Sequence, residues 1–382
     1  MRLFVISPGY PSENNLYNSN FVQKRLDLYK NYNKNWQIEV LIYNKRAIKD
    51  NYYYFNNIKV HNCNLNGILE NYYSMKPDLI LIHFFHRDLF ENFIKKINEP
   101  ILVWVHGVEA LSWKRRLFNF SVSPIEFIKY VVSNSLQLRK FSSLIDYSKK
   151  TGRIKFIFVS KWMKDVCFKD VKNSTDNFEI IPNVVDTDFF DYVPKDFLQR
   201  RNILLIRNFD SKKYATDIAI KAILYLSKNY KGFKDLNFTI IGKGKLWNKL
   251  TKRIENFSNV RLINKFLTHE EIKHYHRENG VFLCPTRQDS QGVSMCEAMS
   301  SGLVPISSNN TAIPEFLNRE AGYLTNNFIE IAKAIEELND NPKLFSEKSI
   351  KAANLIRNLA SFEKTIKKEI DLINSVYQEN KK

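Results

Sequence analysis

Short apolar runs recur along the first half of the chain, and longer helical patterns such as 21–32 and 89–97 lie between several of them. The runs cover 3–6, 38–43, 58–61, 79–84, 101–105, 156–159 and 179–181. Buried strands that alternate with helices are typical of a doubly wound α/β sheet. We therefore expect a Rossmann-like domain in this half.

The second half repeats this alternation more clearly. Its expected strands are 203–206, 238–241, 260–263, 281–283, 304–307 and 322–324. Its expected helices are 216–228, 246–256, 269–277, 293–301 and 329–338. The polar segment 186–201, which contains Pro194, is the natural linker. We expect domains at 1–185 and 200–340, followed by helices at 341–382 that could pack back toward the N-terminal domain.

Composition agrees with a folded intracellular protein. The chain has 382 residues, enough for two domains, and 44% of them are hydrophobic. No apolar run approaches the ~20 residues of a membrane span, and the N-terminus lacks the apolar core of a secretory signal. The four cysteines form no CxxC pair, so we expect reduced, mostly buried thiols and a cytoplasmic location.

The formal net charge of +18 has two explanations. An anionic partner such as nucleic acid, anionic lipid or a phosphorylated substrate would favour it. A lysine- and asparagine-rich proteome would also produce it, without any such partner. The positions at which charge clusters are therefore more informative than the total.

The segment 285–314 holds the most informative chemistry. It predicts a strand end, a loop, a short helix and another strand, with Asp289 before the helix and Glu297 inside it. Gly292 stands between them, where the backbone must approach something closely. Amides at a helix N-terminus attract phosphate, and carboxylates accept hydrogen bonds from hydroxyls. This pattern suits a sugar joined to a phosphate.

Three further residues lie directly after expected strands, where open α/β sheets bind ligands. Arg207 and Lys213 follow the strand 203–206 and could share an anion, although two surface cations of a basic protein would look the same. His106 closes the strand 101–105 and could contact a sugar hydroxyl, or it could be a satisfied structural histidine.

Two other motifs favour structural roles. The IIGKG segment at 240–244 has Trp247 where a dinucleotide-binding motif needs its third glycine, so it indicates only a tight turn. Asp186 and Asp188 follow a proline at the linker, where capping or turn formation is the expected role. We predict no protein-bound metal and no cofactor.

Taken together, these motifs resemble the retaining family 4 glycosyltransferases of GT-B fold. The family pattern E-x7-E resembles PTRQDSQGVSMCEAMSSGLVP, with Asp289 and Glu297 at the acidic positions. Arg207 and Lys213 match its arginine and lysine six residues apart, and His106 matches its N-terminal-domain histidine. The PNVVD phrase at 182–186 is similar to its linker. Tyr214 stands where glycine is common in the family.

The resemblance implies two Rossmann-like domains that face each other across a cleft, with the acceptor bound by 1–185 and the donor by 200–340. Arg207 and Lys213 would bind the donor diphosphate, and Glu297 the nucleotide ribose. Asp289 would bind the transferred sugar, assisted by Gly292 and the amides of Val293 and Ser294. His106 would contact that sugar, so His106, Asp289 and Glu297 are the expected catalytic residues. Transfer would retain anomeric configuration without a metal.

The segment 113–153 predicts an amphipathic helix of basic and aromatic character. Ile125, Ile128, Val132 and Leu136 follow at helical spacing, with lysines and arginines around them. Such a segment suits an anionic membrane surface and hence a lipid-linked acceptor, as the resemblance implies for bacterial capsule or O-antigen polysaccharide assembly. An ordinary helix with this stripe in the core is the alternative.

The leading interpretation is a hexosyltransferase-type enzyme that uses a nucleotide-diphospho-sugar and a glycan or lipid-linked acceptor, in the cytoplasm or peripherally on the inner membrane face. A GT-B sugar-phosphate synthase or phosphorylase with a soluble acceptor is a second hypothesis. A basic nucleic-acid-binding protein is a third, but no such module is found in the sequence. The base, sugar, acceptor and oligomeric state are left open.

Overall fold

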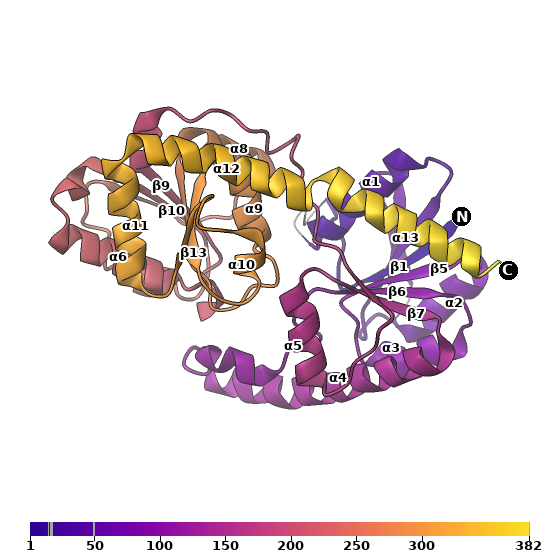
Figure 1. Cartoon of the computed structure of the whole chain (residues 1–382). Helices are drawn as coiled ribbons and strands as arrows, with labels where there is room; N and C mark the ends of the chain where they lie inside the picture. The colour runs from indigo at the N-terminus through magenta and orange to yellow at the C-terminus, as the bar shows by residue number, and fades with distance from the viewer. Residues whose placement is uncertain (14, 16–17, 49, 382) are drawn as a thin grey trace. The chain divides into compact units, whose positions relative to one another are not determined.

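In the computed structural model, which describes residues 1–13, 15, 18–48 and 50–381, the chain divides into two units (Figure 1). The first contains Met1–Lys114, Ile128–Val184 and Thr365–Lys382, and the second contains Arg115–Phe127 and Val185–Lys364. These units differ in two places from the domains expected from the sequence. Residues 115–127 have their contacts in the second unit, and the expected helical tail is divided between the two.

The first unit is built on an eight-stranded sheet in the order β3-β4-β2-β1-β5-β6-β7-β8. All neighbouring strands are parallel except β3 and β4, which are antiparallel. The strands are β1 (Arg2–Ser7), β2 (Gln37–Tyr43), β3 (Asn51–Phe55), β4 (Ile58–Cys63), β5 (Leu79–His83), β6 (Ile101–Val105), β7 (Ile154–Phe158) and β8 (Phe178–Ile180).

Seven of these strands were expected, and β3 was missed. The missed strand, Asn51–Phe55, pairs only with β4 at the sheet edge, and its side chains are exposed or half-buried. Strands β5 and β6, in contrast, are buried at every position. A central strand needs a continuous apolar run, whereas this edge strand is held by backbone pairing and leaves little sequence signal.

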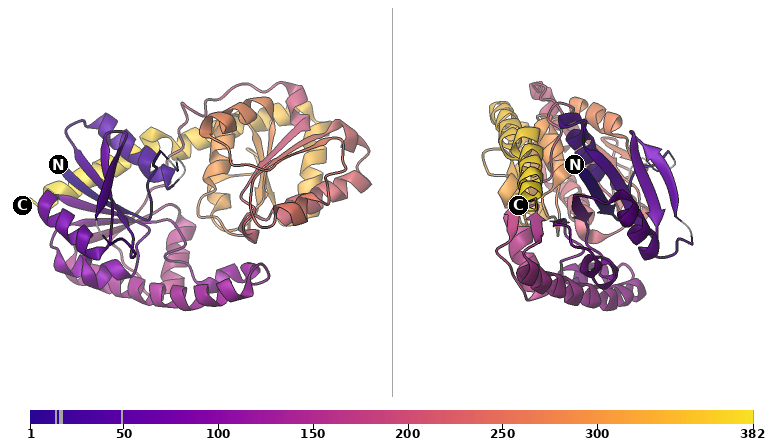
Figure 2. Two further views of the ribbon diagram at one scale, coloured as in Figure 1. Left: turned by 180° about the vertical axis from the view of Figure 1, so that it is seen from behind. Right: turned by 90° about the vertical axis from the view of Figure 1, so that its right-hand side faces the viewer.

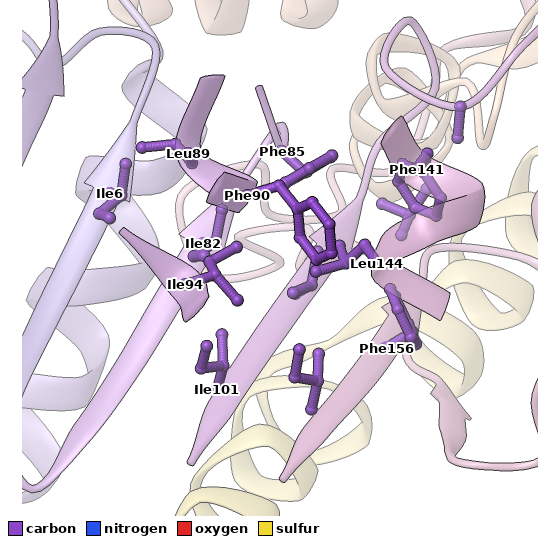
Figure 3. Packing of buried hydrophobic residues seen from close by; sticks show 14 of the residues in the cluster. Ile6, Ile82, Phe85, Leu89, Phe90, Ile94, Ile101, Phe141, Leu144 and Phe156 are labelled. Carbon is purple, nitrogen blue, oxygen red and sulfur yellow. The ribbon is translucent and has the colours of Figure 1, made fainter. Parts of the chain in front are cut away.

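The helices of the first unit cover both faces of its sheet and enclose an aromatic-rich core (Figure 3). The expected helix at 89–97 is shorter, because it breaks at Phe93 and continues as a single 3-10 turn. Phe93 and Ile94 are both buried at this break. The helices are α1 (Asn20–Tyr32), α2 (Leu65–Met75), α3 (Asp88–Asn92), α4 (Pro124–Thr151), α5 (Lys161–Val171) and α13 (Ile366–Glu379).

The second unit contains a six-stranded parallel sheet in the order β11-β10-β9-β12-β13-β14. This is the Rossmann order, in which the chain reverses direction across the sheet between its first and fourth strands. All six strands were expected. They are β9 (Asn202–Ile206), β10 (Asn237–Ile241), β11 (Val260–Ile263), β12 (Val281–Cys284), β13 (Val304–Ser308) and β14 (Tyr323–Thr325).

Helices also flank the sheet of the second unit (Figure 2). The expected helix at 246–256 is shorter in the structure. After Thr251 the chain continues in turns whose backbone hydrogen bonds join residues three positions apart. No helix among the described residues is both long enough and apolar enough to cross a membrane. The helices are α6 (Thr216–Asn229), α7 (Trp247–Thr251), α8 (His269–Glu278), α9 (Val293–Ser300), α10 (Ile313–Phe316), α11 (Phe328–Asp340) and α12 (Pro342–Ala360).

Candidate active site

The loops after β9 and β12 meet at the point where the strand order of the second unit reverses. Open α/β sheets bind ligands at this point, beyond the carboxyl ends of the strands. The loop after β9 carries Arg207 and Lys213, and the loop after β12 leads through Asp289 to α9. The topology thus brings together two sequence segments that are about eighty residues apart, as the Arg207–Ser294 hydrogen bond confirms.

Arg207 is almost fully buried, with 7% of its surface exposed. Its guanidinium donates to the hydroxyl oxygen of Ser294 at 2.6 Å and to the backbone oxygen of Cys284 at 3.3 Å. No carboxylate among the described residues forms an ion pair with it, and its Nε finds no hydrogen-bond partner there. A buried cation in this condition is suited to an anionic ligand.

Lys213 lies in a single 3-10 turn, Lys212–Tyr214, and is half-buried. Its ammonium nitrogen is 4.9 Å from the ring centre of Tyr214, and the guanidinium carbon of Arg207 is 5.2 Å from the same ring. One aromatic ring therefore contacts both expected phosphate ligands. From the sequence, Tyr214 was noted only as a departure from glycine and this role was missed; the available signal was an aromatic residue directly after Lys213.

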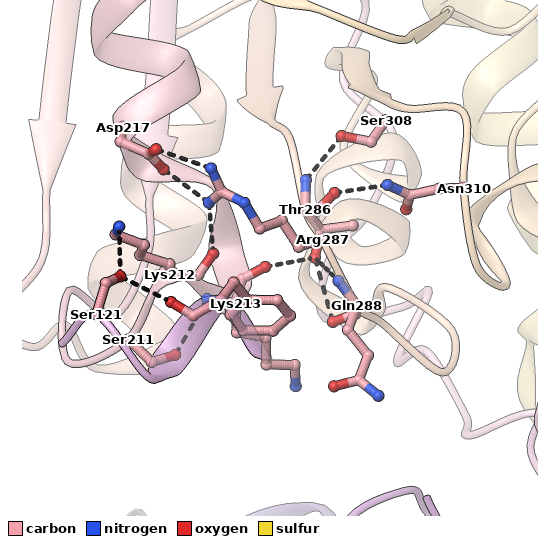
Figure 4. Close-up of polar contacts among 11 residues, drawn as sticks. Ser121, Ser211, Lys212, Lys213, Asp217, Thr286, Arg287, Gln288, Ser308 and Asn310 are labelled. Atoms are coloured by element: carbon pink, nitrogen blue, oxygen red, sulfur yellow. Dashed lines mark hydrogen bonds and ion pairs between the residues drawn. The ribbon is translucent and has the colours of Figure 1, made fainter. Parts of the chain in front are cut away.

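A second group of contacts fixes the turn that carries Lys213 (Figure 4). Arg287 and Asp217 form a two-fold ion pair with both N–O distances at 2.7 Å. The backbone nitrogen of Arg287 also donates to the carbonyl oxygen of Lys213 at 2.7 Å. Burial alone would raise the pKa of Asp217, but the hydrogen bonds and charge of Arg287 lower it overall. Neither Arg287 nor Asp217 was expected from the sequence to belong to the site.

Gly292 precedes α9 with φ of 81°, a left-handed conformation that favours glycine. A Cβ atom there would also lie 2.8 Å from the Cδ1 atom of Ile313. The Asp289 carboxylate accepts a hydrogen bond from the Gly292 nitrogen at 2.8 Å and holds the loop in this shape. The N-cap residue of α9 is Gly292, which has no side chain to cap the helix, so the first amides, including those of Val293 and Ser294, lie at a helix N-terminus without a side-chain cap from that position.

Glu297 lies one turn into α9 and is half-buried. Helix α9 is largely buried, since Met295, Cys296, Ala298 and Met299 are all buried. Glu297 itself is on the more accessible side with Val293 and Ser294. Glu297 is therefore partly accessible to solvent.

The IIGKG segment forms the expected tight turn after β10. A Cβ atom at Gly242 would lie 1.9 Å from the carbonyl oxygen of Arg207, so only glycine lets these two loops meet. The expected turn at Asp186 is also confirmed, because its carboxylate accepts a hydrogen bond from the Phe189 nitrogen at 2.9 Å. All four cysteines are free and buried.

His106 belongs to the first unit and directly follows β6. The Glu109 carboxylate accepts hydrogen bonds from the backbone nitrogens of His106 and Gly107 at 2.6 and 3.0 Å. The His106 Nε2 atom lies 3.1 Å from Nδ1 of His83, so one of the two rings donates to the other. Burial and the charge of Arg25 lower the pKa of His106 well below its usual value, and the ring is neutral at neutral pH.

The first unit also contains a cavity of about 650 Å³ at its own reversal of strand order, between β1 and β5. Its lining includes Pro8 after β1, His83 and Phe84 at the end of β5, and Tyr130 and Gln137 of α4. His83 is 1% exposed, and its Nε2 has no hydrogen-bond partner among the described residues. A mostly apolar cavity with a few polar groups is typical of a small-molecule site.

Comparisons with known proteins agree with this architecture. Residues 200–341 match the family model described as Glycosyl transferases group 1. The match covers the six strands of the second unit, the loops that bear Arg207, Lys213 and Asp289, and helix α9, which bears Glu297. No curated protein matches the sequence.

Solved structures resemble the chain over nearly its whole length at low sequence identity. Sucrose-phosphate synthase from Thermosynechococcus elongatus has a TM-score of 0.77 and 12% identity, with 99% of each chain covered. HepE from Anabaena in complex with UDP-glucose has a TM-score of 0.69 and 13% identity, covering 98% of this chain and 99% of that one. A structure described as trehalose-6-phosphate from E. coli bound with UDP-2-fluoro glucose has a TM-score of 0.70 and 12% identity, with 99% of each chain covered.

These likenesses establish the GT-B fold, with two Rossmann-like domains and a helical C-terminal segment. The match to the family model is confined to residues 200–341 of the second unit, which is less than half of the chain. Together they support sugar transfer as the activity of the protein.

Proposed function

We propose that the protein is a retaining glycosyltransferase that moves a sugar from a nucleotide-diphospho-sugar to a glycan or a lipid-linked acceptor. One observation carries the proposal. Arg207 and Lys213 both contact the aromatic ring of Tyr214, at the point where the strand order reverses. Arg207 also donates a hydrogen bond to Ser294 at the start of α9. Two cations and a helix N-terminus therefore converge on one place.

The proposed role of this cluster is to bind the donor diphosphate. When the glycosidic bond breaks, negative charge grows on the departing phosphate, and fixed cations in a partly buried site stabilise that charge. Arg207 is held rigidly by its contacts with Ser294 and Cys284, so it needs little reorganisation as the reaction proceeds. With these two cations and the amides of α9, transfer requires no divalent metal.

The donor sugar and ribose are assigned to the neighbouring residues. Glu297 accepts hydrogen bonds from the ribose hydroxyls, and Asp289 from the hydroxyls of the transferred sugar. Gly292 and the amides of Val293 and Ser294 form the adjacent wall. The Asp289 oxygen Oδ1 already holds the Gly292 nitrogen, so the other oxygen is the one assigned to the sugar.

His106 is assigned to the donor sugar, as a neutral ring whose Nε2 is engaged by His83. The cavity beside His83 is assigned to the acceptor. Transfer proceeds through an oxocarbenium-like state with retained configuration and without a covalent intermediate. Retention is carried here by the family resemblance of the E-x7-E-like segment, in which Asp289 and Glu297 hold the acidic positions.

The ligands bound in similar structures support a nucleotide-sugar donor. HepE was solved with UDP, with UDP and glucose, and with UDP-glucose. We extend the donor class to this chain, and the base and sugar are left for experiment. Cytoplasmic surface-polysaccharide assembly, in bacteria, is the biological setting that we propose.

A synthase with a soluble acceptor is the competing function. The sucrose-phosphate synthase likeness favours it, because that fold match covers 99% of both chains. A radiolabelled donor tested against sugar phosphates and against a membrane lipid extract distinguishes the two. Label in the lipid phase supports our proposal, and label only in sugar phosphates supports the synthase.

The stereochemical test uses whichever donor is consumed. NMR of the product in the presence of EDTA should show the anomeric configuration of the donor. An inverted product, or activity that returns only when a divalent metal is added, would contradict the proposed mechanism.

A further inference from the structure

Helix α4 has an unusual exposed face. It spans 28 residues, and from Ile128 onward it runs along the outside of the first unit (Figures 1 and 2). The stripe formed by Ile125, Ile128, Val132 and Leu136 is exposed by 71%, 58%, 60% and 44%. The alternative drawn from sequence, in which this stripe packs into the core, is therefore wrong for the structure.

The opposite side of the same helix is the side that packs. Asn134, Phe141, Ile145 and Ser148 are each buried, and they recur at three-, four- and seven-residue spacing. At 100° per residue, this line is on the far side of the helix from Val132 and Leu136. Turning the stripe of α4 inward would expose Phe141 and Ile145. The burial of these two side chains therefore keeps the stripe on the outer side of the helix.

Positive charge accompanies the exposed stripe. Lys129 and Arg139 are exposed on the same side of the helix as the stripe, Lys129 seven residues before Leu136 and Arg139 seven residues after Val132. Neither forms an ion pair with any other described residue, whereas Lys140 pairs with Glu91 at 2.9 Å. The helix contains five basic side chains and two acidic ones, Glu126 and Asp146. An apolar stripe with cationic edges is complementary to apolar chains beneath anionic headgroups.

We propose that the exposed face of α4 binds the surface of an anionic phospholipid bilayer. The apolar stripe enters the headgroup boundary, while Lys129 and Arg139 contact lipid phosphates. The helix is too polar to cross a bilayer, since no described helix meets the requirement for a span, so it lies in the plane of the interface. This surface does not depend on the function proposed above.

One consequence does rest on that function. Tyr130, Ser133, Asn134 and Gln137 of α4 also line the 650 Å³ cavity assigned to the acceptor. Docking of α4 would place this cavity behind the helix, one helix diameter (~10 Å) from the headgroup layer. The acceptor class that fits is then a lipid-linked sugar rather than a soluble one.

Vesicle co-sedimentation tests the surface directly and needs no catalytic activity. The full chain is mixed with vesicles of phosphatidylcholine alone or of phosphatidylcholine with phosphatidylglycerol. We expect binding to the anionic vesicles only, weakened by added salt. The Ile128→Ser/Val132→Ser variant should bind about tenfold more weakly, because two apolar contacts with the bilayer are lost.

Matched control variants test whether the loss of binding is specific to the exposed face of α4 or follows from removing any exposed apolar or basic side chain. The Ile329→Ser/Ile350→Ser variant removes two exposed isoleucines from α11 and α12, and it should bind like the wild type. Lys129→Glu/Arg139→Glu should abolish the preference for anionic lipid, whereas Lys221→Glu/Lys249→Glu should not. Each variant is checked for wild-type circular dichroism and melting temperature.

Two results would overturn the proposal. The first is wild-type binding to neither vesicle, or equal binding by the stripe variant and its control. The second is a dimer in sedimentation velocity that the stripe substitutions convert to monomer, because the stripe would then be covered by a second copy. If vesicles bind but no sugar is transferred, the membrane surface stands and the proposed function fails.

Discussion

At the residue scale, the site depends on how one aromatic ring holds two cations. Tyr214 follows Lys213 directly, so the backbone alone brings the ring and this ammonium together. Arg207 reaches the same ring from the end of β9 and is fixed from its other side by Ser294. The ring thus sets the spacing of two positive charges that would otherwise repel each other.

The role of Tyr214 can be tested by two substitutions. Tyr214→Ala should weaken nucleoside diphosphate binding by about tenfold, since each cation–ring contact contributes about 0.5–2 kcal/mol in a partly buried site. Tyr214→Phe keeps the ring and should bind within about twofold of the wild type. Isothermal titration with UDP, GDP and ADP measures both. Equal loss in the two variants would point to the hydroxyl and contradict this role.

Lys213 and Glu297 carry the second prediction at this scale. Lys213→Ala and Glu297→Ala should each abolish donor use, because one removes the proposed phosphate ligand and the other the proposed ribose ligand. The melting temperature should change little, since both side chains are half-buried. Donor turnover is the measurement, and Lys221→Ala on the exposed side of α6 is the control. Turnover near the wild-type rate in either variant would contradict the site assignment.

At the element scale, helix α13 is fastened to the first unit by a buried carboxylate. Glu369 is fully buried and pairs with Arg25 at 2.8 Å, accepts a hydrogen bond from Trp104 at 3.1 Å, and also contacts the Tyr29 hydroxyl. Sequence patterns predicted a helix in the tail, but they did not reveal this anchor, because its partners are more than 260 residues away. Only the tertiary structure brings them together.

Loss of the Glu369 carboxylate should destabilise the fold strongly, and a second substitution at Arg25 should recover most of that stability. Glu369→Ala should lower the free energy of unfolding by about 3–5 kcal/mol, because it leaves the buried Arg25 without its counter-charge. Arg25→Leu/Glu369→Leu should recover most of that loss, since no charge is then buried. Urea unfolding is the measurement, and Glu379→Ala at the exposed end of α13 is the control. Additive losses in the double variant would argue against the coupling.

The elements themselves were largely predictable, for physical reasons that differ from case to case. Buried parallel strands such as Ile101–Val105 need unbroken apolar runs, so their sequences identify them. The edge strand Asn51–Phe55 needs no such run and was missed. The outward stripe of α4 shows the limit of periodicity, because an amphipathic pattern predicts a helix but does not say which side faces the core.

At the scale of the whole molecule, the sequence predicted the two α/β sheets and the residues that converge after β9 and β12. It did not predict the Tyr214 contacts or the Arg287–Asp217 pair, which depend on how two loops approach at Gly242. It also placed residues 115–127 in the N-terminal domain, whereas their contacts lie with the second unit. Loop-to-loop contacts of this kind leave no periodic signal in the chain.

Buried neutral histidines make the whole fold sensitive to acid. Burial and the charge of Lys195 lower the pKa of His276 to about 3, so it is neutral in the folded state and protonates near pH 6.5 once unfolded. Its contribution is present above the unfolded pKa and is lost as pH falls below it. As the pH falls from about 7.5 to 5.5, protonation of His276 in the unfolded state should lower the free energy of unfolding by about 1.4 kcal/mol. His276→Gln should reduce the pH dependence of urea unfolding by that amount, and an unchanged dependence would contradict this assignment.

The measurement that tests the central claim most directly is a thermal-shift titration with UDP, GDP, ADP and their sugar conjugates in the presence of EDTA. The account predicts that one nucleotide raises the melting temperature without metal and that Lys213→Ala removes the shift while Lys221→Ala keeps it. If no nucleotide stabilises the protein, or if the shift needs a divalent metal or survives Lys213→Ala, the metal-free donor site described here is contradicted.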